Sequence, residues 1–152
     1  MKEPTLGNPQ NTIAVLQKYN FIFQKKFGQN FLIDTHVLDK IIRAAEIGKD
    51  DLVLEIGPGI GTMTQYLSCA AGKVIAVEID RALIPILEDT LDGYDNVRVI
   101  NEDVLKVDIA HGKPPFHPQT GSKNKCWFLF LRYLKENAER NAARIERRKN
   151  NI

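Results

Sequence analysis

The chain has 152 residues, 43% of them hydrophobic and 26% charged, and a formal net charge of +2 at pH 7. This length suits one domain with a modest core, and so small a net charge argues only weakly for any partner. The sequence has no run of about eighteen apolar residues and no signal-peptide core, which excludes a membrane-spanning protein and predicts a soluble, cytoplasmic one. Cys69 and Cys126 have no second thiol or histidine at metal-ligand spacing, so we expect reduced thiols and no metal site.

Charge is distributed unevenly along the chain. Residues 1–110 contain eleven Lys and Arg against sixteen Asp and Glu, whereas residues 111–152 contain ten against three. Such a change predicts either a nucleic-acid-binding tail or a segment of different origin. We therefore divide the sequence into a domain at 1–110, a linker at 111–125 and a basic tail at 126–152.

The first fifty residues predict two helices. Residues 1–10 contain proline and glycine and are expected to be frayed. A short helix is expected to begin at Asn11 or Thr12 and to end near Tyr19. A second helix, within residues 34–48, has apolar residues at helical spacing, which predicts one core-facing side.

A basic and aromatic segment, residues 21–28, separates these two helices. Lys25 and Lys26 are suited to contacts with phosphate groups. The aromatic side chains around them could lie over a bound ligand or could simply pack under a loop. Both interpretations stay open.

Residues 51–61 predict a buried strand that runs into a glycine turn. The apolar residues of an inner parallel strand are Leu52, Val53, Leu54 and Ile56. Gly57, Gly59 and Gly61 allow a ligand to approach the backbone closely. The spacing G-x-G-x-G differs from the G-x-G-x-x-G of dinucleotide-binding proteins, which disfavours a nicotinamide oxidoreductase. With an acidic residue just before it, this spacing is typical of methyltransferases that bind S-adenosylmethionine.

Two further strands bring acidic residues to the same edge of the sheet. The strand at 73–79 contains Glu78, close to the spacing from Gly57 at which a carboxylate accepts ribose hydroxyls. The strand at 97–101 leads to Asp103, which can accept from an adenine amino group.

Helices are expected between these strands, at 62–71 and 81–91. Alternation of strands and helices predicts a parallel sheet with right-handed crossovers. The amino terminus of the first helix would then face the carboxylate and ribose of a ligand at the glycine turn.

Four motifs occur together in this sequence: Lys26-Phe27-Gly28-Gln29-Asn30-Phe31-Leu32, Glu55-Ile56-Gly57-Pro58-Gly59-Ile60-Gly61-Thr62, Val77-Glu78-Ile79-Asp80 and Asn101-Glu102-Asp103. They resemble the ribosomal RNA adenine dimethyltransferase family, in its bacterial small-subunit branch. The resemblance covers roughly residues 10–109, and the G-Q-N-F-L run is highly specific to that family and its antibiotic-resistance relatives.

The resemblance implies a fold, a reaction and a set of cofactor contacts. The fold is an incomplete, Rossmann-like α/β methyltransferase domain, a parallel half-sheet with crossover helices. The reaction is dimethylation of adenines in small-subunit ribosomal RNA by S-adenosylmethionine, with that RNA or a ribosomal subunit precursor as partner and no membrane. The implied cofactor residues are Asn30, Leu32, Gly57, Glu78 and Asp103, with Gly59 and Gly61 shaping the turn.

The catalytic motif of the family, Asn-Leu-Pro-Tyr or Asn-Ile-Pro-Tyr at the end of the fourth strand, is not found in this sequence. Its nearest counterpart, Lys113-Pro114-Pro115-Phe116, has a lysine where an amide oxygen is needed, and lysine has no acceptor. The segment therefore fits a proline-rich linker better than a catalytic loop. We name no catalytic residue.

The remaining residues, Cys126 to about Arg148, are expected to form one amphipathic helix with a basic end, which covers the half-sheet or else contacts phosphate or a membrane surface. The family's fourth and later strands are then expected to be missing, which suggests a change of reading frame near residue 110. A non-catalytic module that binds S-adenosylmethionine or RNA is the alternative function.

Overall fold

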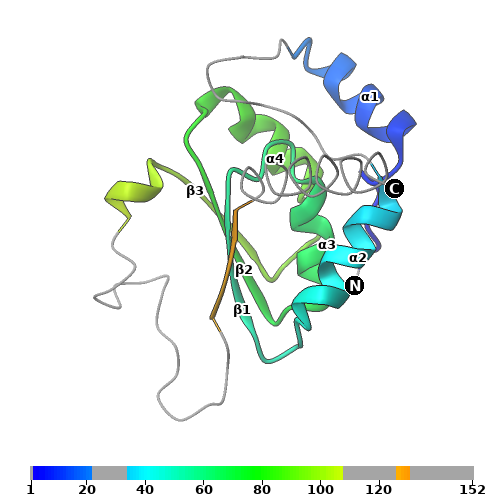
Figure 1. The fold of residues 1–152 in the computed structure, drawn as a ribbon. Helices are drawn as coiled ribbons and strands as arrows, with labels where there is room; N and C mark the ends of the chain where they lie inside the picture. The colour runs from blue at the N-terminus through cyan, green and yellow to red at the C-terminus, as the bar shows by residue number, and fades with distance from the viewer. Residues whose placement is uncertain (1, 22–33, 108–125, 131–152) are drawn as a thin grey trace, which may run out of the picture.

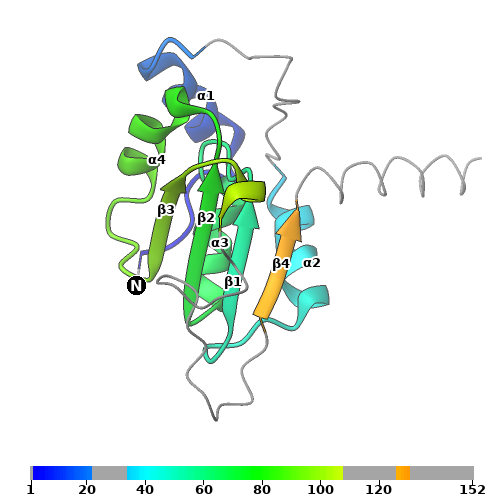
Figure 2. The ribbon, with the colours of Figure 1, turned by 90° about the vertical axis from the view of Figure 1, so that its left-hand side faces the viewer.

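The computed structural model describes residues 2–21, 34–107 and 126–130, and the structural statements below concern these residues. Their centre is a four-stranded sheet of order β3-β2-β1-β4, seen face-on in Figure 2. The strands are β1 (Leu52–Ile56), β2 (Lys73–Glu78), β3 (Val97–Asn101) and β4 (Cys126–Phe130). All neighbouring pairs are parallel, which confirms the predicted α/β class.

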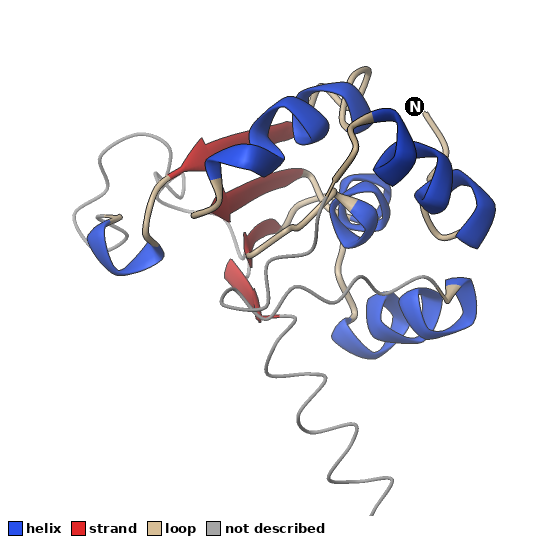
Figure 3. Cartoon of the chain, turned by 90° about the horizontal axis from the view of Figure 1, so that it is seen from above, coloured by secondary structure: helices blue, strands red, loops and turns tan. Residues whose placement is uncertain are grey.

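The helices form a layer on one side of the sheet (Figures 1 and 3). They are α1 (Pro9–Lys18), α2 (Thr35–Ala45), α3 (Thr62–Ala70) and α4 (Ile84–Thr90), and the short 3₁₀ turn η2 (Arg81–Leu83) leads into α4. A second 3₁₀ turn, η3 (Val104–Lys106), follows β3 and lies on the other side of the sheet in Figure 1. Helix α3 connects β1 to β2, and η2 with α4 connects β2 to β3. From β1 through β2 to β3 the chain steps in one direction across the sheet, and right-handed connections then place both crossovers on the same face.

Helix α1 begins earlier than the sequence predicted. Its N-cap is Asn8, whose side chain accepts a hydrogen bond of 2.8 Å from the amide of Gln10, and Pro9 occupies the first helical turn. An asparagine cap followed by proline is a strong start signal, because proline lacks the amide that the first turn cannot satisfy. The predicted start at Asn11 or Thr12 was therefore wrong by about one turn.

The prediction of a frayed amino terminus was wrong as well. Leu6 is only 2% exposed, and the Gln65 side-chain oxygen accepts from the amides of Thr5 at 2.8 Å and Leu6 at 3.1 Å. The Tyr94 hydroxyl donates to the carbonyl of Glu3 at 2.8 Å. These partners lie about sixty to ninety residues away, so local sequence alone could not reveal them.

The predicted helix beginning at Cys126 was wrong over its first five residues, because these form β4. Cys126 pairs with Leu52 and Phe130 with Ile56, in the register of a parallel strand. Five consecutive apolar residues fit a strand inside a parallel sheet as well as they fit a helix, and pairing with β1 satisfies their backbone groups. A fourth strand is therefore present and β1 is not an edge strand; the rest of the predicted helix lies outside the described residues.

Two apolar clusters hold the helical layer together. One joins Leu6 to the glycine turn and α4 and comprises Leu6, Ile60, Leu83, Ile86, Leu87, Leu91 and Tyr94. The other joins α2, α3 and the first two strands and comprises Leu38, Val53, Met63, Leu67, Ala71 and Val74. Helix α3 contributes to the second cluster while its first turn adjoins the glycine turn, so core packing fixes where that turn lies.

Asn96 closes the carboxyl end of α3, and its replacement by aspartate should be costly. Its side-chain nitrogen donates to the carbonyls of Ser68 at 3.0 Å, Ala71 at 3.2 Å and Gly72 at 3.5 Å. A carboxylate cannot donate and would face the negative end of the helix, so we expect N96D to lower the free energy of unfolding by about 2 kcal/mol. Urea denaturation at pH 7 measures this.

The exposed Asn11, which makes one 2.9 Å bond to the carbonyl of Thr5, supplies the control. We expect N11D to cost less than about 1 kcal/mol, because water can replace an exposed hydrogen bond. Equal losses in the two variants would contradict the capping role of Asn96.

Candidate cofactor site

The glycine turn between β1 and α3 has a left-handed backbone at each predicted glycine. The φ angles are +72° at Gly57, +64° at Gly59 and +89° at Gly61. Its start is tied to the sheet, because the Gly57 amide donates to the carbonyl of Val77 at 2.9 Å. Gly61 is the N-cap of α3, and no side chain caps this helix, whose first-turn residues are buried.

Two of these glycines face different surroundings. A Cβ atom built on Gly57 would meet nothing within 4 Å. One built on Gly61 would lie 3.1 Å from Leu91 and Thr90 and 3.3 Å from Leu87. Gly57 therefore leaves space beside the turn, whereas Gly61 allows α4 to pack closely against it.

The structure places Glu78 directly beside this turn, as its spacing predicted. It ends β2 and is 4% exposed. One carboxylate oxygen accepts from the Gly59 amide at 3.2 Å and the other from the Asp80 amide at 2.8 Å. Burial raises the pKa of Glu78, and these amide donors oppose that rise. Because a carboxylate offers about four acceptor positions, Glu78 keeps acceptors for hydroxyl groups.

The acidic loop after β3 lies next to Glu78. The Glu102 amide donates to the carbonyl of Glu78 at 3.0 Å, and the Asn101 side chain donates to the same oxygen at 2.7 Å. Asp103 is half-buried and caps η3 by accepting from the Leu105 amide at 3.0 Å. The sheet thus brings together the glycine turn, Glu78 and Asp103.

Ile79 is a feature of this edge that the sequence analysis did not single out. It follows Glu78 and is 52% exposed, although most large apolar side chains of the described residues are covered. An exposed apolar side chain next to Glu78 at this edge of the sheet suits the flat face of a ring in a ligand. Its position in the sequence, directly after the acidic residue that ends β2, could have indicated that it lies at this edge of the sheet.

Glu55 was also not predicted as a site residue. It lies in the middle of the apolar strand β1 and is 0% exposed. The Thr64 hydroxyl donates to one of its oxygens at 2.7 Å, whereas the other oxygen has no hydrogen-bond partner among the described residues. Burial, with a smaller contribution from the charge of Glu78, raises the pKa of Glu55 to about 7 against the opposing Thr64 bond. Its position as the one acidic residue in an otherwise apolar strand could have indicated, from sequence alone, that Glu55 is unusual.

Several predicted site residues lie outside the described residues: Lys25, Lys26, Asn30 and Leu32. The rejected catalytic candidate, Lys113 to Phe116, lies outside them too. In the described part of the chain, no group of three or more His, Cys, Asp or Glu could hold a metal ion, and no helix has the length and hydropathy to span a membrane.

Comparison with known proteins points to one family. Residues 20–122 match the ribosomal RNA adenine dimethylase family. The ribosomal RNA small subunit methyltransferase A of Lachnoclostridium phytofermentans is 77% identical over 105 residues, which cover 68% of this chain and 36% of that protein. Its counterpart in Alkaliphilus metalliredigens is 58% identical over 102 residues, covering 67% of this chain and 36% of that protein.

A solved structure agrees with these sequence matches. The crystal structure of the 23S rRNA methyltransferase ErmE is 38% identical, with a TM-score of 0.50, over 57% of this chain and 34% of that one. The chain thus spans about a third of the length of the relatives it matches. Together with the glycine turn and the two acidic strand ends, the match over residues 20–122 establishes that this chain belongs to the ribosomal RNA adenine dimethylase family.

Proposed function

We propose that this site binds S-adenosylmethionine and is the cofactor half of an enzyme that dimethylates adenines in small-subunit ribosomal RNA. The observation that carries the proposal is the contact between Glu78 and the Gly59 amide, which joins a nearly buried carboxylate to a left-handed glycine turn. The relatives bearing the small-subunit name share 77% and 58% identity with this part of the chain.

The residues at this edge fit the chemical groups of the cofactor. Glu78 can accept from ribose hydroxyls, Asp103 from the adenine amino group, and Ile79 can cover the face of the ring. The amino terminus of α3 suits the carboxylate of the methionine part. When bound, S-adenosylmethionine supplies a methyl group activated by its sulfonium.

The remaining parts of the proposal rest on the sequence. Asn30 and Leu32 would contact the cofactor, and Lys25 and Lys26 would contact phosphates of the RNA. We assign the cofactor half to residues 1–110, the linker to 111–125 and the basic tail to 126–152, in a cytoplasmic protein. No acceptor of the family's Asn-Leu-Pro-Tyr type occurs in the sequence, so we expect this chain to bind the cofactor more readily than it transfers the methyl group.

Calorimetric titration of the purified chain with S-adenosylmethionine tests the proposal. We expect E78A to raise the Kd at least about tenfold, because hydrogen bonds to a charged group contribute about 1.5–3 kcal/mol. The control is E88A, which removes the same charge from an exposed position on α4 and should leave the Kd within about twofold.

Two results would contradict this assignment: a folded wild-type chain that does not bind, or an E78A variant that binds as well as wild type. Methyl incorporation into undermethylated small ribosomal subunits then separates an enzyme from a binding module. Incorporation by this chain alone would show that an acceptor group outside the family motif exists in it.

A further inference from the structure

A buried chain of hydrogen bonds connects the amino terminus to the helical layer through Gln65. This side chain, on α3, is 1% exposed. Its oxygen accepts from the backbone amides of Thr5 and Leu6, and its nitrogen donates to the carbonyl of Thr90 at 2.8 Å. Both ends of one buried amide group are thus satisfied by segments that lie far apart in the sequence.

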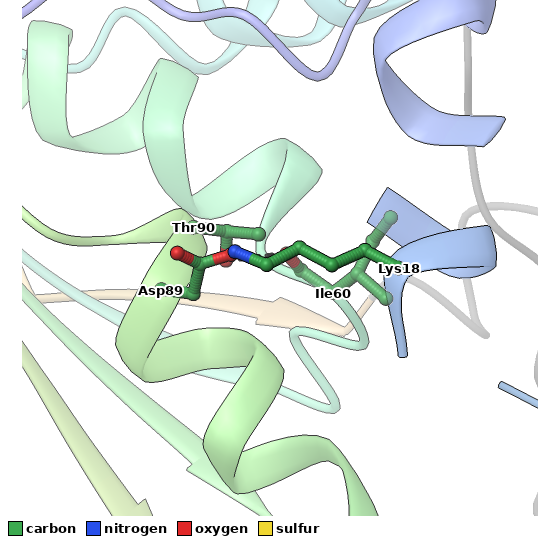
Figure 4. Close-up of polar contacts among 4 residues, drawn as sticks. All are labelled: Lys18, Ile60, Asp89 and Thr90. Carbon is green, nitrogen blue, oxygen red and sulfur yellow. Dashed lines mark hydrogen bonds and ion pairs between the residues drawn. The ribbon is translucent and has the colours of Figure 1, made fainter. Parts of the chain in front are cut away.

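Thr90 continues this chain into the glycine turn. It is the last residue of α4, and its hydroxyl donates to the carbonyl of Ile60 at 2.8 Å, a buried contact drawn in Figure 4. Ile60 lies between Gly59 and Gly61, and Gly61 itself packs against Thr90. The described side chains therefore hold the middle of the turn by a hydrogen bond from α4 as well as by the packing of Ile60.

A second contact lies beside this one but is far more exposed. Asp89 accepts from the Lys18 ammonium of α1 at 2.8 Å, with the two side chains 39% and 59% exposed (Figure 4). Ion pairs at such exposed positions contribute little. The buried contact from Thr90 to Ile60 is therefore the stronger restraint.

We propose that Thr90 is a positioning residue for the cofactor site. By holding the Ile60 carbonyl, it keeps the glycine turn in its ligand-binding shape, and Gln65 links that restraint to the docking of residues 5 and 6. Three glycines at alternate positions give this backbone access to many conformations. A site that is already ordered before binding loses less conformational entropy when the ligand binds. The role in binding rests on the function proposed above.

The test compares T90V, T90S and S68A in the full chain. Valine keeps the shape of threonine without the hydroxyl, and serine keeps the hydroxyl. The control S68A also removes a buried hydroxyl contact, from Ser68 to Asn96, at the opposite end of α3. If T90V does not fold, T90A replaces it.

Two measurements are made on each folded variant. Hydrogen exchange of the ligand-free chain, followed by NMR, reports on the Gly59 and Gly61 amides. The Gly59 amide donates to the Glu78 carboxylate, and the Gly61 amide donates to the carbonyl of Pro58. Titration with S-adenosylmethionine reports the Kd. We expect T90V to speed exchange at these amides about tenfold relative to S68A and to raise the Kd about fivefold, and T90S to restore both values to within about twofold of wild type.

Each outcome decides the proposal. If T90V and S68A change exchange and affinity alike, the hydroxyl of Thr90 has only a general stabilising role and the proposal is overturned. Faster exchange with unchanged affinity overturns the role in binding. A folded wild-type chain that binds no S-adenosylmethionine refutes the proposed function, whereas the exchange data still decide whether Thr90 orders the turn.

Discussion

Replacing Gly61 by alanine should lower the free energy of unfolding by about 3 kcal/mol, because two costs add at this position. Its φ of +89° strains any side chain, at a cost of roughly 1–2 kcal/mol. The new methyl group would also lie 3.1 Å from Thr90 and Leu91, and such overpacking typically costs about 1–3 kcal/mol. Denaturation in urea, with the midpoint and slope fitted together, measures the sum.

Gly57 provides a matched comparison within the same turn. Its φ of +72° brings similar strain, but a Cβ atom there meets nothing within 4 Å, so G57A should cost only about 1 kcal/mol. Its methyl group would instead occupy the space beside the turn, and we expect at least about tenfold weaker binding of S-adenosylmethionine. Equal stabilities of the two variants would show that α4 does not pack against the turn as described.

The second large effect is a dependence of stability on pH that arises from Glu55. Its pKa rises from 4.5 to about 7 on folding, mainly because the carboxyl group is buried. Between these values the folded chain keeps the proton that the unfolded chain has lost, so the free energy of unfolding falls as pH rises. Below pH 4.5 both states are protonated, and above about 7 both are ionised. At 1.36 kcal/mol per pKa unit, Glu55 contributes a fall of about 3 kcal/mol.

The E55Q variant should remove this contribution, because glutamine stays neutral at every pH. We expect its free energy of unfolding to fall less than that of wild type between pH 4.5 and 7, leaving the smaller slope of the same sign from Glu78, whose pKa is also raised. Urea titrations at half-unit pH intervals measure both curves, with E88Q on the exposed side of α4 as control. Parallel curves for wild type and E55Q would mean that the pKa of Glu55 does not differ between the folded and unfolded chain.

The elements around the glycine turn could be predicted because local patterns agree with the tertiary structure there. The strands β1, β2 and β3 and helix α3 lie within a residue or two of their predicted bounds. Continuous apolar runs between glycine turns leave few alternatives to buried strands. Strand β4 has an equally apolar run, but no turn signal separates it from the amphipathic pattern that follows, and only its pairing with β1 decides its structure.

Some residues of the candidate site could be predicted from the sequence and others could not. The position of Glu78 beside the glycine turn could be predicted because the length of a strand-helix-strand unit fixes its distance from Gly57. Glu55 was missed because strand periodicity treats it as one polar residue in an apolar run, and its importance comes from burial under α3 beside Thr64. Thr90 was missed because a threonine near a helix end carries no signal until the fold brings it to Ile60.

The strand order has a further consequence for where a ligand can enter. From β1 the chain moves to β2 and β3 on one side, whereas β4 lies on the other side of β1. The direction of winding therefore reverses between β1 and β4, and in open parallel sheets a crevice forms at the carboxyl ends of the strands where this reversal occurs. The turn at Gly57 leaves β1 at that crevice. A motif that binds the adenine amino group, placed at the end of a strand in the position of β4, would face this turn across the crevice.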